Sequence, residues 1–387
     1  MGHVQRPPTR IVELPETTEG TTPELLTQAL REGGVLGPES VVAEVAHEPI
    51  GVGVGIVGQL ARLTLRYEGT AEGAPGTVIL KMPSQFPENR AIGDHFNFYE
   101  REGRFYQQIG DKLGVRTARC YWNHMDVERQ SFALLLEDLG RRTMISQVAG
   151  VGPDRAAQAL DALGELHRSW WASPVLDGFD WMPRLDDPIT LAAGGQYRES
   201  WPMFVDRVGS ALPEGALEVG ERTQAVFEDL LRTSTAEAPL TVCHGDFRID
   251  NLLFDDAAVG TDRVAVLDWQ ISSRGPGVFD VAYLLCQSMP VADRRAAEEE
   301  LVQGWHAALA GADGRSPDDY SYELAWQHYR RSALVTTVYP VTAAGSMDPA
   351  NERGRELVTA MAVRAFTACL DLDSLELLPR PAGDAQV

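Results

Sequence analysis

Apolar and polar positions divide the chain into a strand-rich first part and a helix-rich second part. Residues 63–67 alternate between apolar and polar side chains, and a period of two predicts a strand with one buried face. Other short apolar runs predict strands over 41–45, 77–81, 118–125, 132–136, 252–254 and 264–267. Helical periodicity takes over at 154–171 and returns in several pieces over 293–370.

Two helices are predicted among the early strands. Thr22-Pro23-Glu24 has the hydroxyl, proline and acid of a helix start, and Gly33-Gly34 ends that helix. The second helix is predicted over 91–112, with an apolar stripe that contains Glu102. A buried carboxylate needs a partner to stay ionised, and Lys81, at the end of the 77–81 strand, is the natural one. The alternative is that Glu102 lies at the edge of the stripe and reaches water.

A glycine-rich segment joins the first two predicted strands. Its residues 53–58 fit the pattern G-x-G-x-x-G, which marks both dinucleotide-binding folds and the phosphate-binding loop of kinases. A dinucleotide fold requires a helix next, whereas the alternation at 63–67 predicts a strand, so a nucleotide-dependent oxidoreductase is rejected. We expect the backbone N–H groups around Gly51, Gly53 and Gly55 to contact phosphates.

The segment from His244 to Asn251 carries the most specific chemistry in the chain. Its order, H-x-D-x-x-x-x-N, is that of a kinase catalytic loop. Phosphoryl transfer needs a carboxylate that accepts the proton of the attacking hydroxyl, which Asp246 supplies, and oxygen ligands for Mg²⁺. Asn251 and Asp268, which follows the 264–267 strand directly, supply those ligands. Asp280, further on, is read as a helix cap or as a tether for this loop.

The apolar run 132–136 leads into Glu137, Asp138 and Leu139 and then Gly140. An apolar strand that ends in a polar, glycine-terminated segment is typical of a hinge between two lobes. Backbone groups of residues 137–139 are expected to bind the edge of an adenine ring. The lobes would then be residues 1–139, which bind nucleotide, and 140–387, which hold the catalytic loop and the acceptor.

Composition narrows the class of partner. The 387 residues carry a formal net charge of −22, which argues against nucleic acid or an anionic membrane surface as the main partner. Four separated cysteines and the lack of an apolar leader predict a soluble cytoplasmic protein without disulfides. His167 is read as a core histidine. The tryptophans at 170, 171, 181 and 201 could belong to the core or line a substrate pocket.

Several strings together resemble the aminoglycoside-phosphotransferase and choline-kinase group of kinase-like enzymes. They are HGDFRIDN (244–251), VLDWQ (266–270) and GPGVFDVAYLL (275–285). Within that group, the chain is most similar to the ecdysteroid-kinase-like branch, which includes bacterial phosphotransferases. The supporting strings are PIGVGVG (49–55), REGRFYQQI (101–109) and FALLLEDL (132–139).

The resemblance implies an α+β, bilobal protein-kinase-like fold and a role for each matching residue. Asp246 resembles the catalytic base, and Arg248 stands where protein kinases often have a Lys in contact with the transferred phosphate. Asn251 and Asp268 resemble metal ligands, and the phosphate-positioning pair and adenine hinge correspond to Lys81, Glu102 and residues 137–139. The implied cofactors are ATP or GTP with Mg²⁺.

The favoured interpretation is a small-molecule kinase that phosphorylates a hydroxyl of a natural product, first of all an antibiotic. A kinase of a sugar, choline-like or steroid alcohol is the first alternative. A pseudokinase that only binds nucleotide is the second, although the complete set of motif residues counts against it. A metallophosphatase is weaker still, because no Asn-His metal motif follows Asp246. The protein is expected to be a monomer or homodimer.

Overall fold

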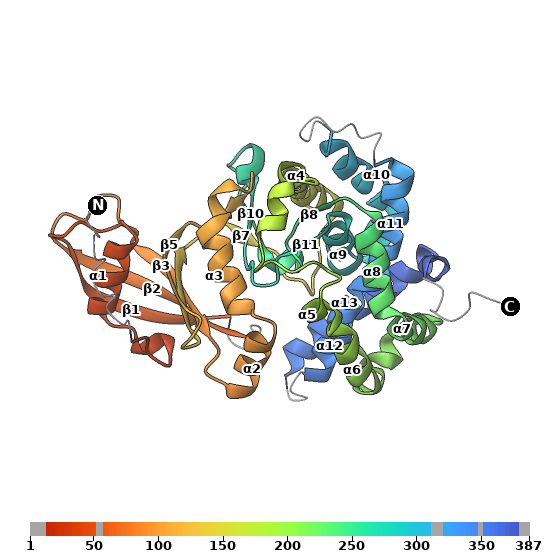
Figure 1. Cartoon of the computed structure of the whole chain (residues 1–387), viewed down its shortest axis with the longest axis horizontal. Helices are drawn as coiled ribbons and strands as arrows, with labels where there is room; N and C mark the ends of the chain where they lie inside the picture. The colour runs from red at the N-terminus through yellow and green to blue at the C-terminus, as the bar shows by residue number, and fades with distance from the viewer. Residues whose placement is uncertain (1–12, 52–56, 311–319, 347–350, 379–387) are drawn as a thin grey trace, which may run out of the picture. The chain divides into compact units, whose positions relative to one another are not determined.

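The computed structural model describes residues 13–51, 57–310, 320–346 and 351–378, and these form two compact units (Figure 1). The first unit contains the described residues up to His95 together with Arg119–Asp138. The second contains Phe96–Ala118 and the described residues from Leu139 onward. The chain therefore passes between the units three times, after His95, after Ala118 and after Asp138, and the last crossing lies within the segment predicted to be the hinge.

The first unit is built on a five-stranded antiparallel sheet. Its strand order is β1 (Val41–Ile50), β2 (Gly58–Glu68), β3 (Thr77–Pro83), β6 (Ser131–Glu137) and β5 (Cys120–Asp126). All five strands were predicted, although β1 and β2 are longer than the apolar runs that indicated them. The alternation at 63–67 is explained by burial, because Leu63 and Leu65 point into the core of this unit while Thr64 and Arg66 are exposed.

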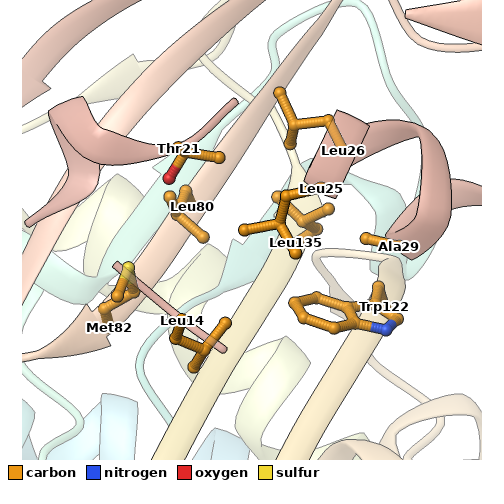
Figure 2. A pocket seen from close by; sticks show the side chains of 9 residues that line it. All are labelled: Leu14, Thr21, Leu25, Leu26, Ala29, Leu80, Met82, Trp122 and Leu135. Carbon is orange, nitrogen blue, oxygen red and sulfur yellow. The ribbon is translucent and has the colours of Figure 1, made fainter. Parts of the chain in front are cut away.

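Helix α1 (Pro23–Glu32) packs on one face of this sheet and begins as predicted. The hydroxyl of Thr22 accepts a hydrogen bond from the backbone N–H of Leu25 at 3.3 Å, which satisfies one of the free N–H groups of the first turn. Figure 2 shows side chains of α1 converging with those of β3, β5 and β6 around a small apolar cavity. Its lining is Leu14, Thr21, Leu25, Leu26, Ala29, Leu80, Met82, Trp122 and Leu135.

The prediction of one helix over 91–112 was wrong, because the structure has three shorter elements there. They are α2 (Pro87–His95), α3 (Phe98–Gln108) and a 3₁₀ turn (Gly110–Lys112). The break is at Asn97, which adopts a left-handed backbone with φ of 55°, a conformation that Asn tolerates better than most residues. Helix α3 groups with the second unit, whereas sequence analysis placed it in the first lobe.

The second unit is mainly helical and contains two small sheets. One has the strand order β4 (Arg116–Thr117), β10 (Val264–Val266), β9 (Leu252–Phe254) and β7 (Thr143–Met144). The other pairs β11 (Ser273–Pro276) with β8 (Leu240–Cys243). Its helices after α3 are α4 (Pro153–Trp170), α5 (Pro188–Leu191), α6 (Ala193–Val208), α7 (Ala216–Ala225), α8 (Phe227–Glu237), α9 (Val278–Ser288), α10 (Val291–Ala308), α11 (Tyr322–Thr336), α12 (Val338–Ser346) and α13 (Glu352–Asp371).

Helix α9 is the centre of the second unit, because every one of its residues is buried. The sequence left open whether the tryptophans at 170, 171, 181 and 201 belong to the core or line a pocket. Three of them, Trp170, Trp171 and Trp201, belong to the hydrophobic core of this unit. Trp181 is half-buried, and its indole N–H donates to Gln108 Oε1 at 2.9 Å. The antiparallel sheet of the first unit and the helices of the second confirm the predicted α+β class.

The structure also describes the state of the cysteines and the hydropathy of the helices. All four cysteines are free thiols, and three of them are buried. Among the helices that the structure describes, none combines the length and hydropathy needed to cross a membrane.

Candidate active site

The predicted catalytic loop brings its carboxylate and its amide together. Strand β8 ends at Cys243, and the loop then runs to a 3₁₀ turn over Ile249–Asn251. The side-chain amide nitrogen of Asn251 donates to the backbone oxygen of Asp246 at 2.9 Å and to its Oδ2 at 3.0 Å. Since Nδ2 is committed to Asp246, the other end of the Asn251 amide presents an oxygen. The Asp246 side chain is 16% exposed, so its carboxylate remains open on one side.

Arg248 lies between two carboxylates of the same loop. Its Nε is 3.4 Å from Asp246 Oδ2, and its Nη1 is 3.6 Å from Asp250 Oδ2. The Nε–H has no hydrogen-bond partner among the described residues, because its geometry toward Asp246 is poor. Burial alone would lower the pKa of Arg248, but the carboxylates of Asp246, Asp250 and Asp268 raise it above its ordinary value. The guanidinium is therefore charged and has donor capacity left for another anion.

Asp268 is held close to Asn251 by the backbone of its neighbour. The N–H of Leu267 donates to Asn251 O at 2.9 Å, and the Leu267 carbonyl accepts from His244 Nε2 at 2.8 Å. Asp268 follows with φ of 64°, a left-handed conformation that turns the chain sharply out of β10. The backbone contacts of Leu267 therefore tie the segment that carries Asp268 to the loop that carries Asp246 and Asn251. The catalytic and metal-binding roles of these three residues stay predictions.

Trp269 occupies the position next to Asp268 and is fully buried. Its ring stacks on Phe105 of α3 with centroids 4.3 Å apart. The indole N–H donates to Thr117 Oγ1 at 3.0 Å and approaches Val266 O at 3.2 Å. The tryptophan thus anchors the segment that carries Asp268 to both α3 and β4.

His244 supports the loop and has no free ring nitrogen. Its Nδ1 accepts the backbone N–H of Asp246 at 3.2 Å, so its proton is on Nε2, which donates to the Leu267 carbonyl. This imidazole therefore cannot serve as a proton acceptor for substrate while the loop keeps this conformation.

Asp280 tethers the catalytic loop, which is one of the two roles that its place in the sequence suggested. Its carboxylate accepts the backbone N–H groups of His244 at 2.7 Å and Gly245 at 2.9 Å. It is fully buried and lies 3.4 Å from His167 Nε2. The other nitrogen of His167 accepts the indole N–H of Trp305 at 3.0 Å, so His167 is the satisfied core histidine that was expected.

His167, Cys243 and Asp280 approach one another closely enough to raise the question of a metal site. Their hydrogen bonds argue for a structural role. Both imidazole nitrogens are engaged as described above, and burial raises the pKa of the Cys243 thiol well above its ordinary value. A protonated thiol is a poor metal ligand, and Cys243 Sγ instead approaches Pro276 O at 3.5 Å.

Gly245 occupies a position that only glycine fits. Its φ is 87°, and a β-carbon there would lie 2.4 Å from the carbonyl oxygen of Ile271. We expect Gly245→Ala to destabilise the protein by about 1–3 kcal/mol, from left-handed strain and overpacking, and to displace Asp246. Urea unfolding measures the loss. Gly304→Ala is the matched control, because a β-carbon at Gly304 in α10 meets nothing within 4 Å; an unchanged midpoint for Gly245→Ala would contradict the argument.

Two tyrosines beside the loop were not identified from the sequence. The hydroxyl of Tyr339 donates to Gly245 O at 2.6 Å, and its ring lies 4.3 Å from that of Tyr283, centroid to centroid. Burial, followed by the Asp246 carboxylate, raises the pKa of both hydroxyls well above the ordinary value. Neutral phenols therefore border Asp246. Tyr283 is part of the matched string 275–285, but nothing in the pattern marks its role, and Tyr339 is 93 residues away from Asp246.

In the first unit, Lys81 lies on the sheet face opposite α1. Its neighbours Leu80 and Met82 line the cavity under α1, so alternation along β3 directs Lys81 to the other face (Figure 2). Its Cε is 3.8 Å from where a β-carbon of Gly58 would be, at the end of the glycine-rich segment. Gly51 is exposed with φ of 67°, whereas Gly53 and Gly55 lie outside the described residues.

Glu102 is buried on α3 as the apolar stripe predicted. Glu102 is only 3% exposed, and Lys81 is 9% exposed. The two residues belong to different units, so their pairing stays a prediction. The alternative in which Glu102 reaches water does not fit its burial.

The two carboxylates of the predicted hinge accept hydrogen bonds from an arginine side chain and from a backbone N–H group. Asp138 accepts from Arg62 Nε at 2.8 Å, and Glu137 Oε2 accepts the backbone N–H of Arg119 at 3.0 Å. The Leu139 carbonyl accepts from Arg142 N at 2.9 Å. Binding of adenine by residues 137–139 stays a prediction. Because both carboxylates already accept hydrogen bonds, we expect the backbone groups of these residues to bind the ring.

Known proteins resemble this chain in sequence and in fold. Among curated proteins, an uncharacterised kinase-like protein of Caenorhabditis elegans is 24% identical over 215 residues, which cover 54% of this chain and 55% of that protein. The chain thus spans about half the length of this relative.

Two solved structures share the fold. Choline kinase from Cryptosporidium parvum aligns with a TM-score of 0.57 and 11% identity, covering 92% of this chain and 98% of that one. The GDP complex of aminoglycoside 2'-phosphotransferase-IIIa aligns with a TM-score of 0.51 and 13% identity, covering 90% and 99%.

The family model described as the phosphotransferase enzyme family matches residues 71–320. This stretch is well over half of the 387 residues and contains Lys81, Glu102 and the whole catalytic loop. The chain therefore belongs to the phosphotransferase enzyme family.

Proposed function

We propose that the protein is a small-molecule kinase that transfers the γ-phosphoryl group of ATP or GTP to an alcohol. One observation carries this proposal: the Asn251 amide is bonded to the Asp246 carboxylate, and Leu267 holds Asp268 next to Asn251. These contacts support a base and two oxygen ligands close together, on the catalytic loop and on the segment that follows β10, which is the arrangement that phosphoryl transfer requires. Membership of the phosphotransferase family supports the same reaction.

The residues present fit Mg²⁺. Asn251 offers an amide oxygen, since its nitrogen is used by Asp246, and Asp268 offers a carboxylate on the segment that Leu267 bonds to Asn251. A hard cation prefers such oxygen ligands, and it completes its shell with water and phosphate oxygens. When bound, the metal neutralises charge that develops on the phosphates.

Asp246 performs the proton chemistry in this proposal. As the alcohol oxygen bonds to the γ-phosphorus and the bond to the β-phosphate oxygen breaks, the alcohol proton passes to the Asp246 carboxylate. Asn251 orients that carboxylate through Oδ2. The unpartnered Nε–H of Arg248 supplies a charged donor beside the base, suited to an oxygen of the transferred phosphate.

For the acceptor, we favour a hydroxylated natural product, first of all an antibiotic. An aminoglycoside phosphotransferase is among the proteins that share the fold, and the chain is proposed to belong nearest to the ecdysteroid-kinase-like branch from its resemblance over 49–55, 101–109 and 132–139. A sugar, choline-like or steroid alcohol remains the alternative, and choline kinase shares the fold equally. The chain is proposed to act in the cytoplasm as a monomer or homodimer, without nucleic acid or membrane.

A transfer screen tests the proposed function. The protein is incubated with γ-labelled ATP or GTP and Mg²⁺ against hydroxylated antibiotics, sugars, amino alcohols and sterols, and products are identified by mass. We expect one acceptor class to gain a phosphoryl group and slow hydrolysis of nucleotide without acceptor. Nucleotide binding without any transfer or hydrolysis would establish the pseudokinase instead.

The predicted Lys81–Glu102 pair is tested by a double-mutant cycle. Lys81→Ala should reduce kcat/KM severely, and Glu102→Ala should do so as well, because a buried carboxylate on α3 needs a cationic partner. The double variant should lose less than the sum, with a coupling of about 0.5–3 kcal/mol. Glu100→Ala, half-buried and bonded to Arg104 on the same helix, is the control. Additive losses would show that Lys81 and Glu102 do not meet.

A further inference from the structure

Gln147, in the segment after β7, is fully buried and bonds to the catalytic loop with both its backbone and its side chain. Its backbone N–H donates to Asp250 Oδ1 at 2.7 Å. Its side-chain Oε1 accepts the backbone N–H of Ile249 at 3.2 Å and the Ser288 hydroxyl at 3.1 Å. Its Nε2 donates to Gln287 O at 2.9 Å. Gln147 therefore connects the two residues that precede Asn251 with the end of α9.

Arg364 of α13 holds Gln147 in this position. Its Nη1 donates to Gln147 O at 2.6 Å and reaches Gln287 O at 3.3 Å, and its Nη2 donates to Val148 O at 2.8 Å. The residue is 9% exposed, and no carboxylate forms an ion pair with it in the described part of the chain. A buried guanidinium with carbonyl partners alone is costly, and burial lowers its pKa.

The segment after Gln147 packs closely against the Arg364 side chain. Gly150 has φ of 81°, and a β-carbon there would lie 2.8 Å from both Arg364 Nη2 and Ser288 O. The next residue, Val151, donates its N–H to Ser288 O at 2.8 Å. If Gln147 served only to anchor α13, its hydrogen bonds to Ile249 and Asp250 would not be needed. These two bonds instead connect it to the loop that carries Asp246 and Asn251.

We propose that Gln147 and Arg364 are positioning residues for the catalytic loop, and that α13 is thereby part of the machinery for phosphoryl transfer. Helix α13 lies beyond residues 71–320 that the family model matches, so the motifs do not contain this support. The proposal rests on the proposed function for its kinetic readout. Its structural readout, the rigidity of residues 244–251, is independent of any activity.

The kinetic test compares Arg364→Met with the wild-type protein. Removing the guanidinium frees the carbonyl of Gln147 and lets the loop shift, and a displacement of about 1 Å can cost on the order of a hundredfold in rate. We expect kcat for nucleotide hydrolysis or transfer to fall about 10–100-fold, with KM for nucleotide changed less than about threefold, because the loop rather than the nucleotide contact is affected. Gln147→Leu should give the same pattern. Arg355→Gln, at an exposed position of α13, is the matched control.

Hydrogen exchange measured by mass spectrometry provides the second readout. In Arg364→Met, peptides that contain residues 244–254 should exchange faster, while those of α4 and α10 remain as in the wild type. Arg364→Lys, which keeps the charge but loses the forked geometry, should be intermediate in both measurements.

The outcomes separate the two proposals. If wild-type protein neither hydrolyses nor transfers, the proposed function fails, whereas faster exchange confined to 244–254 still supports the positioning role. Unchanged exchange and unchanged kcat in folded Arg364→Met overturn the role. If Arg364→Met fails to fold, the decision rests on Arg364→Lys, and equal loosening throughout the second unit would show a merely structural anchor.

Discussion

Asp246→Asn is expected to lose about 10²–10⁴ in turnover, the usual contribution of a positioned general base, while nucleotide affinity stays close to wild type. The amide has nearly the same shape and can still offer its oxygen to the Asn251 nitrogen, which now bonds Asp246 Oδ2 at 3.0 Å. It cannot accept the alcohol proton. Steady-state rates with any acceptor from the screen, or hydrolysis rates without one, measure the loss.

Two controls make this result specific. Asp256→Asn removes a carboxylate that is 74% exposed and paired with Arg155 in the same unit, and it should be silent. A melting temperature within a few degrees of wild type would show that Asp246→Asn keeps its fold. Turnover within about tenfold of wild type would show that Asp246 is not the base.

The sequence predicted the elements whose patterns are local. The alternation over 63–67 and the apolar runs of β3 and β6 indicated the sheet, because each strand buries one face. The order of Asp246, Asn251 and Asp268 indicated the loop, since the chemistry fixes both residue types and spacing. The strand patterns and the 244–251 motif each lie within about ten residues, whereas Asp268 lies 22 residues after Asp246 and is marked by the apolar run that precedes it.

The features that the sequence missed depend on the tertiary structure. The break at Asn97 interrupts a stripe that is periodic on both sides, and a single left-handed residue leaves no trace in that pattern. Tyr339 and Gln147 bond to the catalytic loop from segments far along the chain, and Arg364 bonds to Gln147. Their types are common in cores and on helices, so their contacts with the loop become visible only once α9, α12 and α13 are packed.

His244 shows how a motif can mislead about roles. In sequence it stands two residues before the base, where an imidazole could be taken for a participant in proton transfer. In the structure, its two ring nitrogens are used by Asp246 N and Leu267 O. The histidine is therefore required for the path of the backbone, and the chemistry of the loop is left to the carboxylates.

Removal of Mg²⁺ and the substitution Asp268→Asn are both expected to slow catalysis severely. Each change removes the proposed interaction between the metal and the Asp268 carboxylate. A bound metal contributes several kcal/mol to the stabilisation of a phosphoryl transition state, and 1.36 kcal/mol is a factor of ten in rate. Loss of the carboxylate should therefore reduce turnover by about a thousandfold. Asn suits the left-handed backbone of residue 268, with φ of 64°, so the variant should keep the turn that follows β10.

Calorimetric titration with ATP, with and without Mg²⁺, tests the metal contact directly. Wild-type protein should bind MgATP more tightly than ATP in EDTA, because Asn251 and Asp268 would hold the metal that neutralises the phosphate charge. In Asp268→Asn that difference should shrink, while affinity in EDTA stays the same or rises slightly, since a negative charge near the phosphates has been removed. Asp262→Asn, in the exposed turn before β10, should keep the wild-type difference. If wild-type protein binds and turns over ATP equally well in EDTA, the metal-dependent mechanism is wrong; if Asp268→Asn keeps the full Mg²⁺ effect, the metal is held by other residues.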